Sequence, residues 1–133
     1  MGEPNPNEVV QYILVRDDLD MSVGKLMAQS GHAAERTIGL LNSRLAGTSP
    51  WQNSWKNEWD QHDYPKIVLA VDSEKELLKR HEALVKDGYT CFLVRDVGRN
   101  EIAPSPTALG LEPMPRHVAK PFVKRLQTFK LKK

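Results

Sequence analysis

The chain has 133 residues, with 40% hydrophobic and 27% charged side chains, a composition that is ordinary for one globular domain. A chain of this length buries most of its unfolded surface without disulfide or metal cross-links. Its apolar runs fall well short of the roughly 20 residues that a membrane-spanning helix needs, which excludes that class of membrane protein. Cys91 is the only cysteine, which excludes an internal disulfide and a thiolate metal cluster.

The two ends of the chain differ in charge. The first residues, MGEPNPNE, carry acids and prolines where a secretory signal needs a basic start, so we expect a disordered tail over residues 1–8 and a cytoplasmic protein. Residues 9–133 are expected to form one domain with a basic C-terminal extension. The net charge is only +2, yet the segment from Arg116 to Lys133 holds seven Lys or Arg and no acid. This asymmetry favours a polyanionic partner, with a solvated basic terminus as the alternative.

The first expected elements are a strand and a long helix. QYILVR, residues 11–16, has the composition of a buried strand and runs into a loop at Asp17. A helix is expected from near Ser22. Its small and apolar residues share one face at a period of 3.6, which predicts contact with a sheet; they are Val23, Leu26, Met27, Ser30, Ala34, Thr37, Ile38 and Leu41. The opposite side is predicted to carry Lys25, Gln29, His32 and Arg36.

A short second helix is expected to begin with Ser49 as its N-cap and Pro50 in its first turn. It carries three tryptophans at four-residue spacing, Trp51, Trp55 and Trp59, which therefore share one face. Such a stripe is typical of core or rim packing, and stacking of nucleobases is the alternative.

A strand and a helix follow in close succession. Residues 66–71, KIVLAV, are expected to form a second buried strand. Ser73 and Glu76 have the spacing of a capping box and predict a helix directly after this strand. Gly88 is expected to end that helix.

The last expected elements are two strands and a C-terminal helix. Residues 89–95 and 107–111 are predicted strands, separated by the loop DVGRNEIAPSP. A final helix is expected either to be broken by its prolines or to begin near Pro121, because proline disrupts a helix interior. The alternation of strands and helices predicts an α/β fold.

Acidic residues follow two of the predicted strands. Asp17, Asp18 and Asp20 come after the first strand, and Asp96 comes after the third. Ligands of α/β sheets gather beyond the carboxyl ends of strands, and the helix start that carries Lys25 offers free N–H groups to an anion. We therefore expect a cleft at this edge, although a turn-forming Asp96 and a solvated Lys25 are alternatives. The four histidines fall on separate expected elements, so no metal site is predicted.

Two segments resemble the class II peptidyl-tRNA hydrolases, the archaeal and eukaryotic type. They are VRDDLDMSVGKLMAQSGHAA, residues 15–34, and LVRDVGRNEIAPSPTALGLEP, residues 93–113, and KIVLAVDSEKEL, residues 66–77, matches the middle of the same pattern. The resemblance implies a three-layer α/β/α sandwich with a four-stranded mixed sheet. It also implies metal-independent hydrolysis of the ester of peptidyl-tRNA, with no cofactor and with the tRNA acceptor end as partner. Positioning a water and stabilising an oxyanion suffice for such an activated ester.

The same resemblance assigns the candidate site residues. Asp96, Lys25, Gln29 and His32 stand where the family has the same residue in its cleft. Asn100 completes the candidate catalytic set, and the candidate substrate-binding residues are Asp20, Arg99 and Arg36. Asp96 is expected to orient or deprotonate water and Lys25 to stabilise negative charge. Gln29 and His32 are expected to order the site through hydrogen bonds.

Three positions depart from the family pattern. Asp20 and Val23 stand where the family usually has lysines, and Asn100 stands where it has a threonine proposed to assist catalysis. A lost oxyanion donor costs about 100-fold to 1000-fold in rate, so a tRNA-binding module without turnover is an alternative function, as is a protein-interaction adaptor.

The basic extension PFVKRLQTFKLKK is expected to replace the missing positive charges. The oligomeric state is open, with a homodimer as one alternative.

Overall fold

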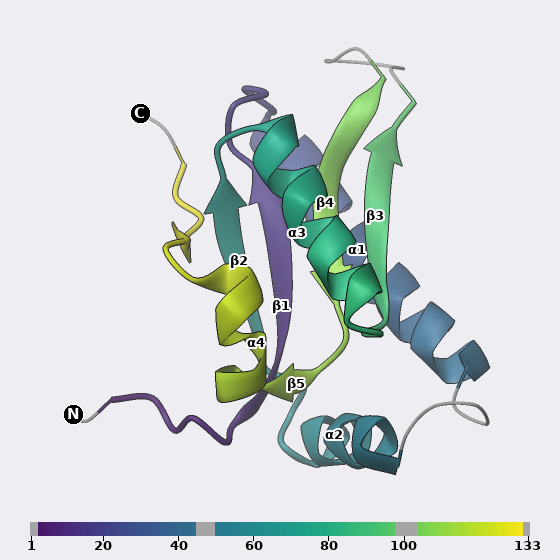
Figure 1. The fold of residues 1–133 in the computed structure, drawn as a ribbon. Helices are drawn as coiled ribbons and strands as arrows, with labels where there is room; N and C mark the ends of the chain where they lie inside the picture. Colours follow the sequence, from purple (N-terminus) through teal and green to yellow (C-terminus); the bar gives the residue numbers. More distant parts are fainter. Residues whose placement is uncertain (1–2, 45–49, 98–103, 132–133) are drawn as a thin grey trace.

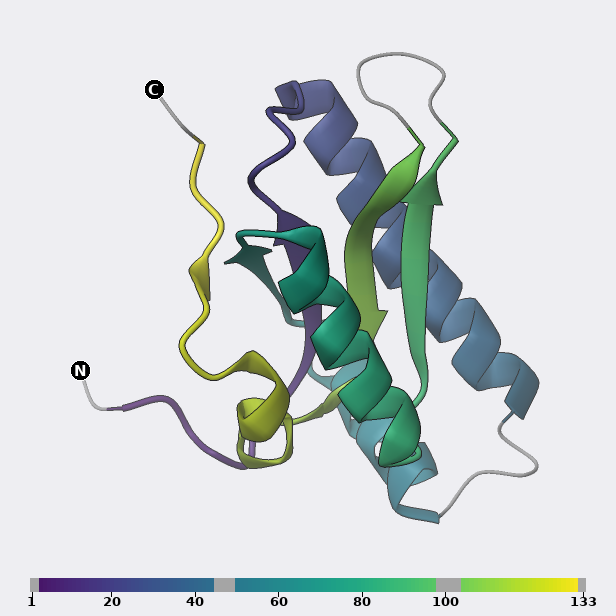
Figure 2. The same cartoon turned by 45° about the horizontal axis from the view of Figure 1, so that its top comes forward.

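The computed structural model describes residues 3–44, 50–97 and 104–131 and has three layers, with helices on both faces of a mixed sheet (Figures 1 and 2). The long strands are β1 (Val9–Arg16), β2 (Lys66–Val71), β3 (Cys91–Asp96) and β4 (Ser105–Leu111). The helices are α1 (Val23–Arg44), α2 (Pro50–Gln61), α3 (Glu74–Lys86) and α4 (Arg116–Val123). The predicted α/β/α fold is confirmed. Two short strands, β5 (Met114–Pro115) and β6 (Gln127–Thr128), are added to the four expected ones.

Strand β1 lies at the centre of the sheet, whose order is β3-β4-β1-β2-β6. It runs parallel to β2 and antiparallel to β4, and β3 and β4 are also antiparallel. All eight of its residues are buried. Tyr12 and Leu14 join the core under α3 and α4, whereas Ile13 and Val15 join the core under α1. Coverage on both faces explains why this strand is a nearly continuous apolar run.

Helix α1 crosses the sheet at very short range above β4. A Cβ atom on Gly110 would overlap the carbonyl oxygen of Ala33 and the hydroxyl of Thr37, so only glycine fits there. The Thr37 hydroxyl donates a hydrogen bond to the Ala33 carbonyl, 2.7 Å away. The hydroxyl is therefore not left unpaired in this apolar interface. This contact sets the height of α1 over β3 and β4.

The predicted sheet-facing side of α1 is partly wrong. The residues of α1 that are buried are Gln29, Ala33, Thr37 and Leu41. Val23 and Met27, both assigned to the buried face, are 51% and 70% exposed. The physical reason is the short distance at Gly110, because small side chains must lie beneath the helix there and the larger apolar ones turn to its side.

Helix α2 begins at Pro50, as expected, whereas its predicted N-cap Ser49 lies outside the described residues. Trp59 is buried, and its indole N–H donates to the carbonyl of Pro65 at 2.9 Å. Trp55 packs against the core beneath α3 and α4, and Trp51 remains 42% exposed. Two of the three indoles therefore pack within the protein, which agrees with the packing interpretation.

The C-terminal helix differs from the prediction. It begins at Arg116, directly after Pro115, and contains Pro121 in its interior instead of starting there. Ala119 and Phe122 are buried in the core beneath α3, and this packing offsets the hydrogen bond that Pro121 cannot donate. Among the described residues, no helix is long and apolar enough to span a bilayer.

Candidate active site

The site begins with a buried ion pair between the first turn of α1 and the last residue of β3. The Lys25 ammonium lies 3.1 Å from Oδ1 of Asp96. Their side chains are only 11% and 5% exposed. The two side chains that the sequence expected to face each other are therefore in direct contact. Removing two charges from water is costly, so such a pair in a small domain calls for a reason beyond stability.

The second carboxylate oxygen of Asp96 is the atom of this pair that can take part in a reaction. Oδ2 is buried and receives no hydrogen bond from any described residue. Buried polar atoms in proteins are nearly always satisfied, and exceptions gather at functional sites. With Oδ1 held by the ammonium of Lys25, Oδ2 is directed to accept a proton or a hydrogen bond from a bound molecule.

Gln29 lies one helical turn after Lys25, and a residue missed by the sequence analysis holds it in place. The hydroxyl of Thr107, on β4, donates to Oε1 of Gln29 at 2.5 Å. The register of β3 and β4 shifts at this point, pairing Val94 with Ala108 and Arg95 with Pro106, so Thr107 is the extra residue of a β-bulge. Bulges redirect side chains next to active sites, and here the bulge sends Thr107 toward α1.

A sequence signal for Thr107 did exist. Pro106 ends the predicted loop directly before the predicted strand 107–111, whereas the structure places it inside β4, and proline in a sheet is confined to edges and bulges. The hydrogen bond also orients the amide of Gln29, since its oxygen accepts from Thr107 and its NH2 group must point elsewhere. That NH2 group is a candidate donor to a substrate oxygen.

Arg16 fixes the loop that leads into α1. Its guanidinium binds both carboxylate oxygens of Asp18, at 3.0 and 2.8 Å, and donates to the carbonyl of Pro106 at 3.0 Å. The hydrogen bond with Asp18 raises the pKa of Arg16, despite the opposing effect of burial. Because the buried Arg16 side chain links the β1–α1 loop to the start of β4, it fixes the position of the ion pair relative to the bulge.

Helix α1 is capped at its start next to the ion pair. The backbone N–H of Lys25 donates to the hydroxyl of Ser22 at 3.3 Å, and Leu26 N–H donates to the carbonyl of Ser22 at 2.9 Å. The predicted helix start near Ser22 is confirmed. The positive end of the helix dipole therefore lies beside the ammonium of Lys25, which favours negative charge at this place.

The other predicted site residues lie apart from the ion pair. His32 is half-buried, and its imidazole forms no hydrogen bond with another described residue. Arg36 lies over the ring of Phe92, 5.7 Å from its centroid, and the rise of an α-helix puts its Cα about 16 Å from that of Lys25. Asp20 is exposed, with a φ of 54°, and faces the other side of α1. Arg99 and Asn100 lie outside the described residues.

Comparisons with known proteins point to one family. Residues 9–129 match the family described as peptidyl-tRNA hydrolase PTH2. A peptidyl-tRNA hydrolase of Sulfurisphaera tokodaii is 38% identical over 77% of this chain and 84% of its own length. One of Saccharolobus islandicus is 34% identical over 86% of this chain and 93% of its own length. A solved structure of a protein of unknown function from Agrobacterium tumefaciens, 13% identical, has the same fold with a TM-score of 0.58, over 92% of this chain and 98% of its own.

Proposed function

The chain belongs to the peptidyl-tRNA hydrolase PTH2 family, and from this premise we propose that it hydrolyses the ester bond of peptidyl-tRNA. The products are free tRNA and the released peptide. The single observation that carries the proposal is the buried Lys25–Asp96 ion pair, in which Oδ2 of Asp96 has no hydrogen-bond partner among the described residues. Since peptidyl-tRNA is made by ribosomes, we place the activity in the cytoplasm.

The proposed reaction is a direct attack of water on the ester carbonyl carbon. Oδ2 of Asp96 takes the proton from the attacking water, and a positioned general base contributes about 100-fold to 10,000-fold in rate. The carbonyl oxygen becomes negative in the tetrahedral intermediate, and the ammonium of Lys25 and the NH2 group of Gln29 stabilise it. The bond to the ribose oxygen then breaks, and that oxygen receives the proton from Asp96.

The chemistry of the substrate supports this assignment of roles. An ester needs no covalent enzyme intermediate, because an oriented water and a stabilised oxyanion lower the barrier sufficiently. The proposal accordingly involves neither a metal ion nor a cofactor. Thr107 acts as a positioning residue in this scheme, since it contacts Gln29 and holds its amide in one orientation.

The direct test is release of the blocked amino acid from purified N-acetyl-aminoacyl-tRNA. We expect turnover by the unmodified protein, in the presence of a chelator as well as without it, and a loss of at least about 100-fold in kcat for Asp96→Asn. Asp72→Asn is the matched control, because Asp72 is an exposed aspartate that follows the end of β2. It should retain full activity.

The alternatives named from the sequence predict different results in the same assay. A tRNA-binding module retains tRNA affinity without any turnover, and an adaptor shows neither. Equal turnover by Asp96→Asn and the unmodified protein would contradict the role assigned to Asp96. Absence of turnover in the unmodified protein would overturn the proposed activity itself.

A further inference from the structure

The C-terminal segment, residues 124–131, is attached to the edge of the sheet near β2. Thr128 pairs with Leu69 and Gln127 with Ala70 in the β6 ladder. The N–H of Phe129 continues this pairing by donating to the carbonyl of Val68 at 2.9 Å. These contacts fix the backbone of the segment at an edge that would otherwise expose unpaired groups of β2.

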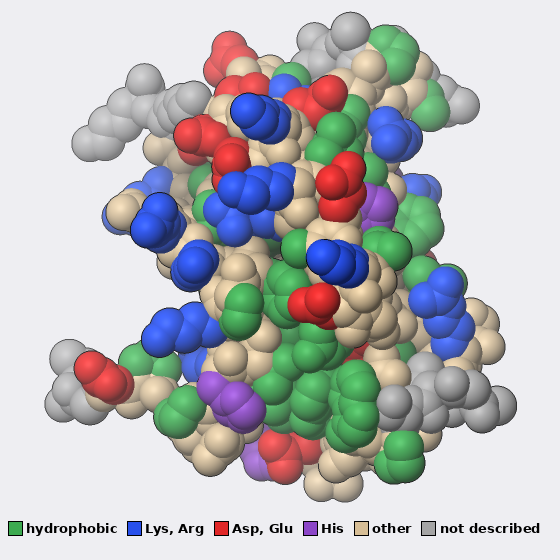
Figure 3. Space-filling model, in the orientation of Figure 1, with side chains coloured by type: hydrophobic (Ala, Val, Ile, Leu, Met, Phe, Trp, Pro, Cys, Tyr) green, Lys and Arg blue, Asp and Glu red, His purple; other side chains and the backbone are tan. Residues whose placement is uncertain are grey.

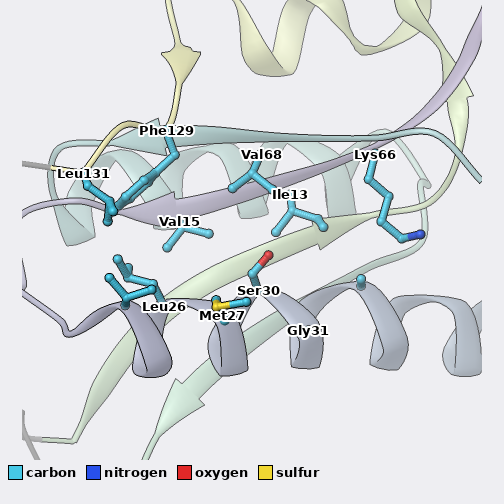
Figure 4. Close-up of a pocket in the computed structure, with 12 residues that line it drawn as sticks. Ile13, Val15, Leu26, Met27, Ser30, Gly31, Lys66, Val68, Phe129 and Leu131 are labelled. Atoms are coloured by element: carbon cyan, nitrogen blue, oxygen red, sulfur yellow. The ribbon is translucent and has the colours of Figure 1, made fainter.

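Two side chains of this segment reach into an apolar groove beside α1. The groove has a volume of about 490 Å³ and lies between α1 and the β1–β2 part of the sheet. Figure 4 shows Phe129 and Leu131 across the groove from Leu26 of α1, with Val15 of β1 beside Phe129. Phe129 also packs against the core cluster beneath α1. The segment is therefore anchored by side-chain packing as well as by backbone hydrogen bonds.

The anchor carries Lys130 to the loop that precedes the candidate active site. A smaller cavity of about 210 Å³ is lined by Lys130 together with Asp20 and Ser22 of the β1–α1 loop. Ser22 caps the helix whose first turn carries Lys25. The basic end of the chain is thus next to the start of α1, although it is about 100 residues away in sequence.

Most of the positive charges of α4 and the C-terminal segment form no ion pair within the described part of the chain, although Arg116 pairs with Glu8 and Lys130 lines a cavity together with Asp17 and Asp20. Lys120, Lys124, Arg125 and Lys130 are exposed and take part in none of its ion pairs. The sequence from Arg116 onward holds no acid that would neutralise them. Figure 3 shows Lys and Arg side chains gathered on the side of the molecule where α4 and the C-terminal segment lie. Mutual repulsion of such cations is relieved by a polyanion.

We infer that the C-terminal segment is a second contact for tRNA, in which Phe129 anchors the segment and Lys124, Arg125 and Lys130 bind backbone phosphates. This inference rests on the proposed function, because the 3′ end of the same tRNA is placed in the Lys25–Asp96 site. Contacts of this kind supply affinity without reading sequence, which suits an enzyme that accepts tRNAs of every specificity.

The test compares two triple variants that lose equal charge. The first is Lys124→Gln/Arg125→Gln/Lys130→Gln. The control is Arg44→Gln/Lys79→Gln/Lys86→Gln, whose exposed residues end α1 and lie in the middle and at the end of α3, outside the groove that holds Phe129. Each is assayed with full-length N-acetyl-aminoacyl-tRNA and with N-acetyl-aminoacyl-adenosine, a substrate that lacks the tRNA body.

We expect the first triple variant to raise KM for the full-length substrate by about tenfold at low salt and to leave kcat unchanged. The salt dependence of log affinity should become shallower by about one unit for each phosphate that the variant no longer neutralises. Hydrolysis of the small substrate should stay as in the unmodified protein, and the control should change neither substrate. Phe129→Ala should shift KM in the same direction, with circular dichroism confirming that the fold is retained.

Two kinds of failure are distinguishable. If the first triple variant matches the control in KM and in salt dependence, the C-terminal segment is not a tRNA contact. If the unmodified protein hydrolyses neither substrate, the proposed function fails. Filter binding of deacylated tRNA to the two triple variants then still decides the inference, since equal affinities would overturn it.

Discussion

The two flanks of α1 differ in burial, because polar side chains are buried on one flank and an apolar side chain is exposed on the other. On the flank toward β3 and β4, Lys25 is almost buried against Asp96 and Gln29 is buried against Thr107. On the flank toward β2, apolar Met27 is 70% exposed above an open groove. Stability alone favours the reverse arrangement, because polar groups lose solvation when buried and apolar groups gain by burial. The polar flank agrees with the proposed reaction, and the groove on the apolar flank holds Phe129 and Leu131 of the C-terminal segment.

The difference between the flanks also shows how one helix serves two purposes. Its closest contact with the sheet, at Gly110, is made by small residues and lies between the two flanks. The contact at Gly110 holds the helix without using its larger side chains. The polar side chains of one flank can therefore form the ion pair, and the apolar side chains of the other flank can line the groove. Substitutions on each flank should therefore have separable effects.

The largest effect is expected from Lys25→Met on the polar flank. Loss of the ammonium leaves the carboxylate of Asp96 buried and unpaired, which typically costs about 3–5 kcal/mol of stability. Turnover should fall about 100-fold to 1000-fold, because the oxyanion loses its main stabilising charge. Urea denaturation and the hydrolysis assay measure the two quantities.

A double variant separates structure from chemistry at this pair. Lys25→Met/Asp96→Asn removes both charges, so it should recover much of the lost stability while remaining inactive. Recovery of turnover together with stability would show that the pair is only structural, contrary to the role proposed for it.

The next largest loss of stability is expected from Gly110→Ala, at the contact that lies between the two flanks. Gly110→Ala forces α1 away from β4, and overpacking of this kind costs about 1–3 kcal/mol. Because the displacement moves both flanks, turnover should fall as well. Gly39→Ala is the control, since a Cβ there meets nothing within 4 Å and alanine favours the helix. A lower melting temperature for Gly39→Ala than for Gly110→Ala would contradict the close-contact explanation.

A second buried carboxylate, Glu112, has no cation beside it among the described residues and shows how burial then changes the pKa of an acid. Glu112 is fully buried, and its Oε2 accepts from the N–H of Thr90 at 2.6 Å and from Gln52 at 2.9 Å. Burial raises its pKa above the ordinary value of 4.5, although both hydrogen bonds oppose the shift. Since the folded state holds this proton more tightly than the unfolded state, its contribution to stability is complete below pH 4.5 and is lost as pH rises through the folded pKa.

Glu112→Gln removes this titration while keeping the shape of the side chain. We expect the free energy of unfolding of the variant to lose less with rising pH than that of the unmodified protein. Urea titrations at several pH values from about 4 to about 8 measure both curves. Parallel curves would show that Glu112 does not titrate differently in the folded and unfolded states.

The smallest effect is expected on the apolar flank. Met27→Gln should change stability by less than about 0.5 kcal/mol and leave turnover unchanged, because the side chain is already largely in water. Met21→Gln is the contrasting variant, since Met21 is 9% exposed and belongs to the core beneath α1. Equal losses for the two methionines would mean that the groove is closed in solution.

The arrangement of strands and helices followed from local patterns in the sequence. Strand β2 begins and ends at the predicted residues, and the N-cap Ser73 of α3 accepts from the N–H of Glu76 as the capping box predicts. These features depend on residues that are neighbours in the chain, so the sequence alone predicts them. The juxtaposition of Lys25 with Asp96 was also expected, because both follow strand ends at one edge of the sheet.

Tertiary structure alone decided how α1 is turned and what lies on its two sides. Hydrophobic periodicity finds the most apolar side of a helix, but the side that faces the sheet was set by Gly110, which admits only small residues above it. Pro106 signals a bulge in the sequence, but only the fold shows that the bulge brings Thr107 to Gln29, and the attachment of Phe129 depends on pairing with β2. Each of these is a contact between residues distant in sequence, and a local pattern holds no information about the distance between such residues.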